Sequence, residues 1–387
     1  MKIVIFSDVF TPLVNGITTF VKNYSMSLAD NGHDVYIIAP RYKNEKEFSY
    51  KNIKVIRVWA LPFPVYPGFK LTSPYNYKIH KLIKEINPDI IHFQVAMPLG
   101  FQAILFSRIY KIPLIGTFHT FFTDKEYLKH VNLDYRFVED LAWGYNKLFY
   151  NRCDLITCPA ISTKEELDKH NFNKKILSIS NLINIDIFSK HKSNDTIKKL
   201  NLGDKSIIYF GRISREKNIE YLLNTFSLVL KNIPKAKFLI VGEGPQFEEL
   251  KKKCVELKIS DNVIFTGLVK HKDLFSYIKG CGIFVTASTT ETFGLTTIEA
   301  MTCGLPGIGL DATGTRDIIK DGVNGYLIKN KNDSEKEFAS KIIKLLTDDK
   351  LRAKFSTMAL FESKKYDQKK IIKIWEEEYS KLMIKNR

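Results

Sequence analysis

Short apolar runs alternate with helical segments along most of this 387-residue chain. In the first half, the run Lys2–Phe6 precedes Ile17–Asn31, whose apolar residues recur at helical spacing. Strands that are apolar on both faces and separated by helices are typical of a parallel sheet with helices on both sides. The other strands predicted for this half are Val35–Ala39, Lys54–Trp59, Asp89–Phe93, Pro113–Phe118 and Asp154–Cys158.

The alternation stops at Ser189–Asp204, a polar stretch with the composition of a linker, and restarts with the strand Ser206–Phe210. The chain is also longer than one hydrophobic core usually supports. We therefore predict an α/β protein with two Rossmann-like, doubly wound domains, residues 1–188 and 189–367, facing each other across a ligand-binding cleft. Residues 368–387 form an amphipathic helix that we expect to cross back to the first domain.

Composition narrows the class of protein and its partners. The 59 Lys and Arg residues exceed the 42 Asp and Glu residues, and the stretch from Lys51 to Lys84 contains no acid. This excess favours an anionic partner (a phosphate-bearing substrate, an acidic membrane or nucleic acid), with compositional bias as the alternative. Hydrophobic residues at 44% exclude wholesale disorder, and no apolar run is long enough to span a membrane. The apolar start is too short for a signal peptide, so we expect a cytoplasmic protein.

Several common catalytic signatures are missing from the sequence. It has no G-x-x-x-x-G-K-[ST] phosphate loop, no G-x-G-x-x-G after the first strand, no H-E-x-x-H and no G-x-S-x-G. It also lacks Asp-x-Asp, a short carboxylate pair that holds a metal–diphosphate complex, and its five cysteines form no C-x-x-C pair. We therefore expect neither a metal site nor a cofactor.

The segment ETFGLTTIE at 291–299 follows a predicted buried strand and opens a helix. Gly294 permits a tight turn, and Thr296 or Thr297 is placed to cap a helix whose amides and dipole face an anionic ligand. A carboxylate accepts two hydrogen bonds side by side, which suits a vicinal diol on a sugar. We expect Glu291 and Glu299, the latter in the first helical turn, each to hold one diol; solvated glutamates pairing with the helix dipole are the alternative.

Two cations follow the strand Ser206–Phe210. Arg212 and Lys217, in GRISREKN, leave the carboxyl end of this strand toward the crevice where ligands of such sheets bind. Together they can neutralise a diphosphate without a metal, which agrees with the missing Asp-x-Asp. The alternative is a pair of ordinary surface cations.

Two residues of the first half are candidates for the same ligand. Gly16 begins the first predicted helix, where backbone without a side chain can approach a ligand closely. His119 follows the strand Pro113–Phe118 at a carboxyl end. A hydrogen-bonded core histidine is the alternative for His119.

The segments GRISREKN and ETFGLTTIEA, in this order and separation, resemble the retaining GT-B glycosyltransferases of family four. The resemblance implies a nucleotide-diphosphate-sugar donor in the C-terminal domain, an acceptor in the N-terminal domain, and metal-independent transfer with retention at the anomeric carbon. Further similar stretches, which extend the likeness over nearly the whole chain, are SDVFTPLVNGI, GTFHT, VGEGP at 241–245, VIFTGLV at 263–269 and DGVNGYL at 321–327.

The resemblance also implies roles for single residues. Glu299 would bind the ribose, Glu291 the hydroxyls of the transferred sugar, and Gly16 would cap the diphosphate. Glu291 and His119, which would touch the sugar, are the expected catalytic residues. The expected donor-binding residues are Gly16, Arg212, Lys217, Phe293, Gly294, Leu295 and Glu299. The chain departs from the family in reading Ser180–Asp186 without Pro or Gly near the domain junction, and Thr313-Gly314 in place of Gly-Gly.

The segment from Trp59 to Ile86 combines aromatic residues, prolines and lysines, as an interfacial membrane patch does. An amphipathic helix packed on the sheet is the alternative, because the apolar residues of 75–86 fall on one helical face. The region after His119 resembles bacterial enzymes that glucosylate diacylglycerol, with a His-Thr followed by an acidic, tyrosine-rich stretch. The expected membrane-binding residues are Trp59, Phe63, Tyr66, Phe69, Lys70, Lys78, Lys81 and Lys84.

These observations predict a peripheral membrane enzyme that moves a hexose, glucose from UDP-glucose, to a lipid acceptor such as diacylglycerol. The expected partners are the nucleotide-sugar, the lipid and the anionic inner face of the cell membrane, and not nucleic acid. A soluble or polysaccharide acceptor is one alternative, and a sugar-nucleotide epimerase is another. A nucleic-acid-binding module stays open on charge alone, although no helix-turn-helix or zinc-finger signature occurs.

Overall fold

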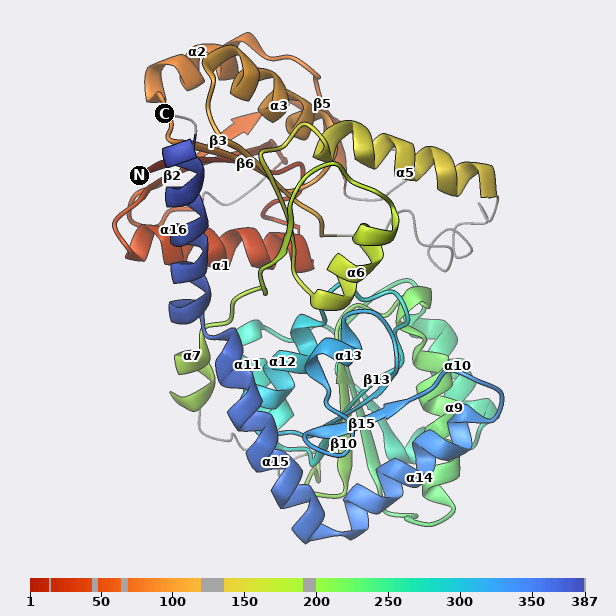
Figure 1. The fold of residues 1–387 in the computed structure, drawn as a ribbon. Coiled ribbons are helices and arrows are strands. Elements are labelled where there is room, and N and C mark those ends of the chain that lie inside the picture. The colour runs from red at the N-terminus through yellow and green to blue at the C-terminus, as the bar shows by residue number, and fades with distance from the viewer. Residues whose placement is uncertain (14, 44–47, 64–68, 120–135, 191–199, 386–387) are drawn as a thin grey trace. The chain divides into compact units, whose positions relative to one another are not determined.

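The computed structural model describes residues 1–13, 15–43, 48–63, 69–119, 136–190 and 200–385, and these residues form two compact units (Figure 1). Unit 1 consists of the described residues up to Ile183 together with those from Asp367 onward. Unit 2 consists of the described residues from Asn184 to Tyr366. Each unit has its own parallel sheet.

Unit 1 is built on a seven-stranded sheet in the order β3-β2-β1-β6-β7-β8-β9, in which every pairing is parallel. Its first six strands in chain order follow the Rossmann order 3-2-1-4-5-6. A separate antiparallel pair, β4 (Ala60–Pro62) and β5 (Lys70–Thr72), lies outside this sheet. The seven strands are β1 (Lys2–Phe6), β2 (Asp34–Pro40), β3 (Ile53–Val58), β6 (Ile90–Phe93), β7 (Leu114–Thr117), β8 (Leu155–Cys158) and β9 (Ile176–Ser178).

The helices of unit 1 cover both faces of this sheet. Along β1, Ile3 and Ile5 belong to the cluster formed with α1 and α16, whereas Val4 and Phe6 belong to the cluster formed with α2, α3 and α5. This alternation is the period-2 pattern of a strand buried on both sides. Figure 1 shows α16, the last helix of the chain, crossing α1. The helices are α1 (Gly16–Asp30), α2 (Tyr77–Ile86), α3 (Pro98–Tyr110), α5 (Arg136–Tyr150), α6 (Ile161–Lys169) and α16 (Gln368–Lys385).

Unit 2 repeats this design with a six-stranded parallel sheet in the order β12-β11-β10-β13-β14-β15. Numbered within the unit, this is again the order 3-2-1-4-5-6. Its strands are β10 (Ser206–Phe210), β11 (Lys237–Val241), β12 (Val263–Phe265), β13 (Ile283–Thr286), β14 (Gly307–Leu310) and β15 (Gly325–Ile328).

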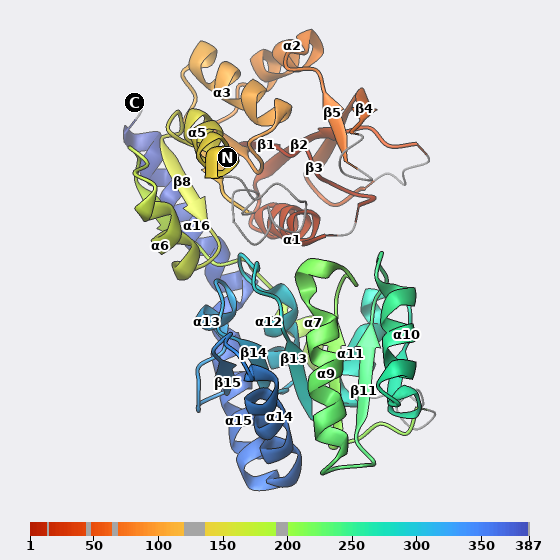
Figure 2. The same cartoon turned by 90° about the vertical axis from the view of Figure 1, so that its right-hand side faces the viewer.

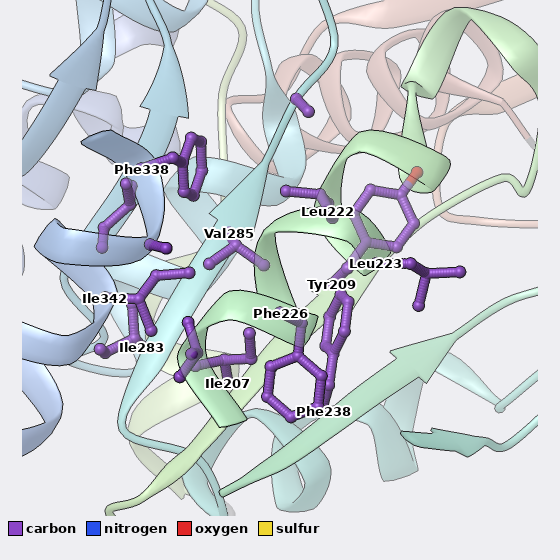
Figure 3. Close-up of a cluster of buried hydrophobic side chains, with 14 of the residues drawn as sticks. Ile207, Tyr209, Leu222, Leu223, Phe226, Phe238, Ile283, Val285, Phe338 and Ile342 are labelled. Carbon is purple, nitrogen blue, oxygen red and sulfur yellow. The ribbon is translucent and has the colours of Figure 1, made fainter. Parts of the chain in front are cut away.

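One hydrophobic cluster of unit 2 lies between its sheet and the helices α9 and α14 (Figure 3). Phe226 of α9 and Ile342 of α14 pack beside alternate strand residues such as Ile207 and Val285. Figure 2 shows α9 and α10 beside β11, the strand that they flank in the chain. The helices are α7 (Ile185–Lys190), α9 (Ile219–Leu230), α10 (Phe247–Glu256), α11 (His271–Lys279), α12 (Leu295–Thr302), α13 (Thr315–Ile318), α14 (Ser334–Thr347) and α15 (Asp349–Ser363), with short 3-10 turns η1 (Arg215–Lys217), η2 (Ser260–Asn262) and η3 (Lys364–Tyr366).

The α/β class and the doubly wound sheets predicted from the sequence are confirmed, and the predicted strands of the first half occur within two residues of their expected bounds. The sequence placed one domain boundary after residue 188 and another after residue 367, whereas the units divide at Ile183/Asn184 and Tyr366/Asp367. Among the described residues, no helix has both the length and the apolar character needed to cross a bilayer.

Candidate functional site

The carboxyl ends of β10 and β13 define the centre of the candidate site in unit 2. These two strands are neighbours, and the chain continues from β10 toward β11 on one side and from β13 toward β14 on the other. At such a switch point the two following loops separate, and ligands of open α/β sheets bind in the crevice between them. GRISREKN follows β10, and ETFGLTTIE follows β13, so the two predicted motifs meet here.

Glycines in the loop after β11 allow close packing against the loop after β10. A Cβ atom on Gly242 would overlap the carbonyl oxygen of Gly211, and one on Gly244 would overlap that of Ile213. The backbone amides of Gly211 and Ile213 donate to the carbonyl oxygens of Val241 and Glu243 at 3.0 and 2.9 Å. The VGEGP motif therefore holds the backbone of the Arg212 loop in place.

Lys217 and Glu291, 74 residues apart in the chain, form an ion pair and a hydrogen bond through Nζ and Oε1. Lys217 ends η1, Glu291 lies in the loop after β13, and their side chains are 23% and 22% exposed. Ser288 strengthens the link between the loops, since its hydroxyl donates to the Glu216 carbonyl oxygen at 3.1 Å. The structure thus brings together one residue predicted to bind the diphosphate, Lys217, and one predicted to bind the sugar, Glu291.

Arg212 is exposed at the start of the same loop. A hydrogen bond fixes its backbone: the hydroxyl of the buried Tyr209 donates to the Arg212 carbonyl oxygen at 2.9 Å. Burial, together with the nearby carboxylate of Glu291, raises the pKa of Tyr209 well above its usual value, so this phenol stays protonated and keeps donating.

The loop 291–294 is shaped by two glycines. Gly294 has a φ of +85° and is the residue that precedes α12. A Cβ on Gly314 would lie 2.6 Å from the Glu291 carbonyl oxygen and 2.8 Å from the Phe293 nitrogen, so this glycine backs the loop directly. Phe293 is buried and packs edge-on against Tyr366, with ring centroids 5.7 Å apart.

Two local expectations for this segment were wrong. The residue before α12 is Gly294, with no side-chain cap, so Thr296 and Thr297 are helical and cap nothing. The helix begins at Leu295, which places Glu299 in its second turn rather than its first. Glu299 is half-buried there. The reason is physical: Gly294 adopts a left-handed conformation without steric cost, so the helix begins at Leu295, one residue before the threonines.

His119 lies in unit 1, two residues after β7, and is 8% exposed. Its Nε2 lies 2.8 Å from Gln94 Oε1, which fixes Nε2 as the donor, and its ring packs against Phe20 with centroids 4.8 Å apart. Burial lowers the pKa of His119 to about 3, so the imidazole is neutral at physiological pH. It is a hydrogen-bonded buried histidine, and it also lines a cavity.

Gly16 is the first residue of α1, and the preceding Asn15 caps the helix by accepting from the Thr18 amide at 2.9 Å. No heavy atom would lie within 4 Å of a Cβ on Gly16. Neither packing within unit 1 nor a positive φ therefore requires glycine at this position.

Asp8, two residues after β1, is a buried acid that the sequence analysis did not select. Its Oδ1 accepts from the Leu99 amide at 3.2 Å, and its Oδ2 has no hydrogen-bond partner among the described residues. Burial raises the pKa of Asp8 to about 7. Its place after the first strand was the only available signal, because burial is not visible in a sequence.

The predicted membrane patch is divided by the fold. Trp59 is 65% exposed, and Lys78, Lys81 and Lys84 are exposed on α2. The apolar face of α2 packs in the core through Ile79, Ile83 and Ile86, as the alternative of an amphipathic helix on the sheet had it. Phe63, Phe69 and Lys70 are half-buried, and Tyr66 lies outside the described residues.

Within the described ranges, no group of three or more His, Cys, Asp or Glu side chains is placed to hold a metal ion.

Two family models match the chain: "Glycosyltransferase Family 4" over residues 14–187 and "Glycosyl transferases group 1" over residues 191–360. Alpha-monoglucosyldiacylglycerol synthase of Streptococcus pneumoniae is 29% identical over 86% of this chain and 76% of its own length. The synthase of the same name from Acholeplasma laidlawii is 28% identical over 100% of this chain and 98% of its own length.

Among solved structures, Anabaena HepE in complex with UDP and glucose superposes with a TM-score of 0.76 at 18% identity, covering 98% of this chain and 100% of that one. This likeness supports the fold. The two matched models, the relatives and the two doubly wound sheets lead to one conclusion: the chain belongs to the family four glycosyltransferases of GT-B fold.

Proposed function

We propose that this glycosyltransferase moves glucose from UDP-glucose to a lipid acceptor such as diacylglycerol, with retention at the anomeric carbon and without a metal ion. The observation that carries the donor half of the proposal is the pairing of Lys217 with Glu291 where the loops after β10 and β13 meet. One loop brings cations and the other a carboxylate, the two kinds of group that a sugar diphosphate needs. The relatives named as glucosyldiacylglycerol synthases support glucose and the lipid, and the UDP complex of HepE supports the nucleotide.

Each donor residue then has a role that follows from its chemistry. Arg212 and Lys217 neutralise the diphosphate, and the amides of Phe293 to Leu295 donate to sugar and phosphate. Glu291 accepts hydrogen bonds from the sugar hydroxyls, and Glu299 accepts them from the ribose. Because the Lys217 amine is already held by Glu291, this lysine is positioned before the donor arrives and loses little freedom when it binds.

Transfer develops positive charge on the sugar ring and negative charge on the departing diphosphate. Fixed cations beside the diphosphate stabilise that charge without reorganising, which is the largest kind of contribution to many enzymatic rates. The bond between the anomeric carbon and the diphosphate oxygen breaks while the acceptor hydroxyl forms the new bond on the same face and passes its proton to the leaving phosphate. No side chain is needed as a nucleophile in this scheme.

Residues of unit 1 complete the donor contacts in this proposal. Gly16 offers open backbone to the diphosphate, and its lack of any structural need for glycine supports a role in binding. His119 is neutral because of its burial, and its Nε2 already donates to Gln94, so its Nδ1 accepts a hydrogen bond from a sugar hydroxyl. Trp59, Lys78, Lys81 and Lys84 attach the protein to the anionic inner face of the cell membrane, each lysine contributing about 1 kcal/mol near the surface.

The decisive experiment is product analysis after incubation with UDP-glucose and diacylglycerol in anionic vesicles, with and without EDTA. We expect an α-linked glucolipid in equal yield under both conditions. Isomerised nucleotide-sugar without a glycolipid would identify an epimerase, and free or polymeric glucoside would identify a soluble acceptor. Loss of the product in EDTA would overturn the metal-independent scheme.

Two substitutions test the assigned carboxylates. Glu299→Ala should weaken UDP-glucose binding, measured by equilibrium titration, because the ribose loses its acceptor. Glu291→Ala should mainly lower turnover, by about 100-fold or more, if its contacts strengthen in the transition state. Wild-type binding and turnover in both variants would refute the roles.

A further inference from the structure

Unit 1 contains a cavity of about 390 Å³ at the carboxyl end of its sheet. Its walls are the segment after β6, the start of α1, His119 after β7, and one side of α5. This size lies within the range of small-molecule sites. The lining residues are Ile17, Gln94, Val95, Ala96, Met97, His119, Val138, Leu141, Ala142, Tyr145, Asn146 and Tyr150.

The chemistry of the lining selects a neutral, mostly apolar ligand. None of the lining residues carries a charge at neutral pH, since burial keeps His119 unprotonated. A phosphate, carboxylate or nucleotide placed here would lose its hydration without gaining a counter-charge, which is costly. A hydrocarbon chain would instead exchange water for aliphatic and aromatic contacts.

One polar group in the wall stands out. Gln94 is fully buried, and its Oε1 is held by His119 Nε2 at 2.8 Å. Its Nε2 is also buried and has no hydrogen-bond partner among the described residues. A buried donor of this kind is costly to leave unsatisfied, so a ligand with an acceptor oxygen beside Gln94 gains from it.

Exposure differs along the cavity wall. Leu141 and Tyr145 of α5 are 63% and 44% exposed, whereas Gln94, His119 and Tyr150 are buried. The wall therefore includes an exposed apolar rim on α5 and a buried polar floor. This order matches a lipid whose acyl chain lies along the exposed apolar rim while its ester and hydroxyl end reaches the buried polar floor.

We propose that this cavity binds the ester-proximal part of one acyl chain of the acceptor lipid, with Gln94 Nε2 donating to the ester carbonyl oxygen. The proposal rests on the proposed function, because it takes a glycerolipid as the acceptor. His119 lies in the wall beside Gln94, so the bound ester keeps the acceptor hydroxyl close to the residue assigned to the transferred sugar.

Chain-length dependence is the first test, made on the full-length protein without donor so that it does not depend on turnover. Titration calorimetry with short-chain diacylglycerols should show affinity rising about fourfold per methylene until the cavity is filled, and then levelling off. Ala142→Phe should obstruct the cavity and flatten the rise. Ala142→Val, a smaller change that keeps folding safe, should shorten it.

Leu148→Phe is the matched control, since Leu148 lies on the same helix, is 53% exposed and does not line the cavity. It should bind every chain as the wild type does. An equal effect of the substitutions at Ala142 and Leu148, or no measurable diacylglycerol binding by the wild type, would overturn the proposal.

The ester contact has its own test. Wild-type protein should bind an ester-linked lipid about fivefold more tightly than its ether analogue, which lacks the carbonyl. Gln94→Met removes the donor and should bring this ratio to one. The ratio cancels any general effect of the substitution on His119, so an unchanged preference would overturn the role of Gln94.

These outcomes separate the cavity from the reaction. If acyl-chain binding responds to Ala142→Phe but no glucose is transferred to diacylglycerol, the proposed reaction is refuted and the proposed role of the cavity is retained. If Ala142→Phe transfers glucose to diacylglycerol with the wild-type rate and KM, the proposed role of the cavity is refuted and the proposed reaction is retained.

Discussion

Gly314 offers a direct test of how the donor loop is held. It has φ +79° and ψ −50°, a combination that residues with a side chain rarely adopt, and its Cα faces the backbone of the loop 291–293. Gly314→Ala therefore imposes two costs. The backbone conformation costs about 1–3 kcal/mol, and inserting a methyl group 2.6 Å from the Glu291 carbonyl oxygen adds about 1–3 kcal/mol of overpacking.

A matched glycine separates these two costs. Gly322 has a φ of +71°, but a Cβ there would meet no atom within 4 Å. Gly322→Ala should therefore show only the conformational cost. In a unit of this size each 1 kcal/mol corresponds to about 2–4 °C in Tm, so we expect Gly314→Ala to lower the Tm about twice as far as Gly322→Ala.

Ligand binding gives the sharper readout. The overlap at Gly314 is relieved most easily by moving the backbone of residues 291–293, which carries Glu291 and the amide of Phe293. We expect Gly314→Ala to weaken UDP-glucose binding at least tenfold in equilibrium titration, while Gly322→Ala binds normally. Equal stability losses and unchanged affinity in both variants would refute this account of the loop.

Three further predictions concern unit 1. Burial raises the pKa of Asp8 from 3.8 to about 7, so as the pH rises the carboxyl group ionises first in the unfolded chain, and the stability of the native state falls between about pH 4 and 7. Asp8→Asn should remove this fall: in urea unfolding the variant should be more stable than the wild type by up to about 4 kcal/mol at pH 8 but by little at pH 4. Parallel pH profiles of the two proteins would contradict this account. Gly16→Ala should not lower the Tm, because nothing lies within 4 Å of the new methyl group and the φ is not positive, yet it should weaken donor binding; unchanged binding would remove the proposed contact. Tyr379→Phe deprives the Tyr24 hydroxyl and His92 Nδ1 of a buried partner and should cost about 1–3 kcal/mol in denaturant unfolding, whereas an unchanged midpoint would show that water replaces it.

The alternation of apolar runs was enough to predict both sheets, because strands buried on two faces must be apolar throughout. Shorter elements escaped the same reasoning. The strands Ile176–Ser178 and Gly325–Ile328 and the pair β4–β5 were not predicted. Three or four residues are too few to show a period, and these strands form only through pairing with neighbours.

The candidate site shows a similar division. Lys217 and Glu291 were selected by residue type and by their place after strands, and the topology brings them together. The residue at which α12 begins depends on the positive φ of Gly294, and the raised pKa of Asp8 depends on complete burial. Both are tertiary properties that one sequence does not carry. The exposed lysines of α2 could be recognised from the sequence. The sequence did not show whether the apolar face of that helix contacts lipid or the protein core.

The last helix has a consequence for how the protein is made. Trp375 and Tyr379 of α16 are fully buried in the core of unit 1, yet the 183 residues from Asn184 to Tyr366 are translated between Ile183 and this helix. At ordinary elongation rates the ribosome takes roughly 10–40 s over them. During that interval the nascent first unit carries an uncovered hydrophobic face, which makes it a natural client for chaperones until the end of the chain arrives.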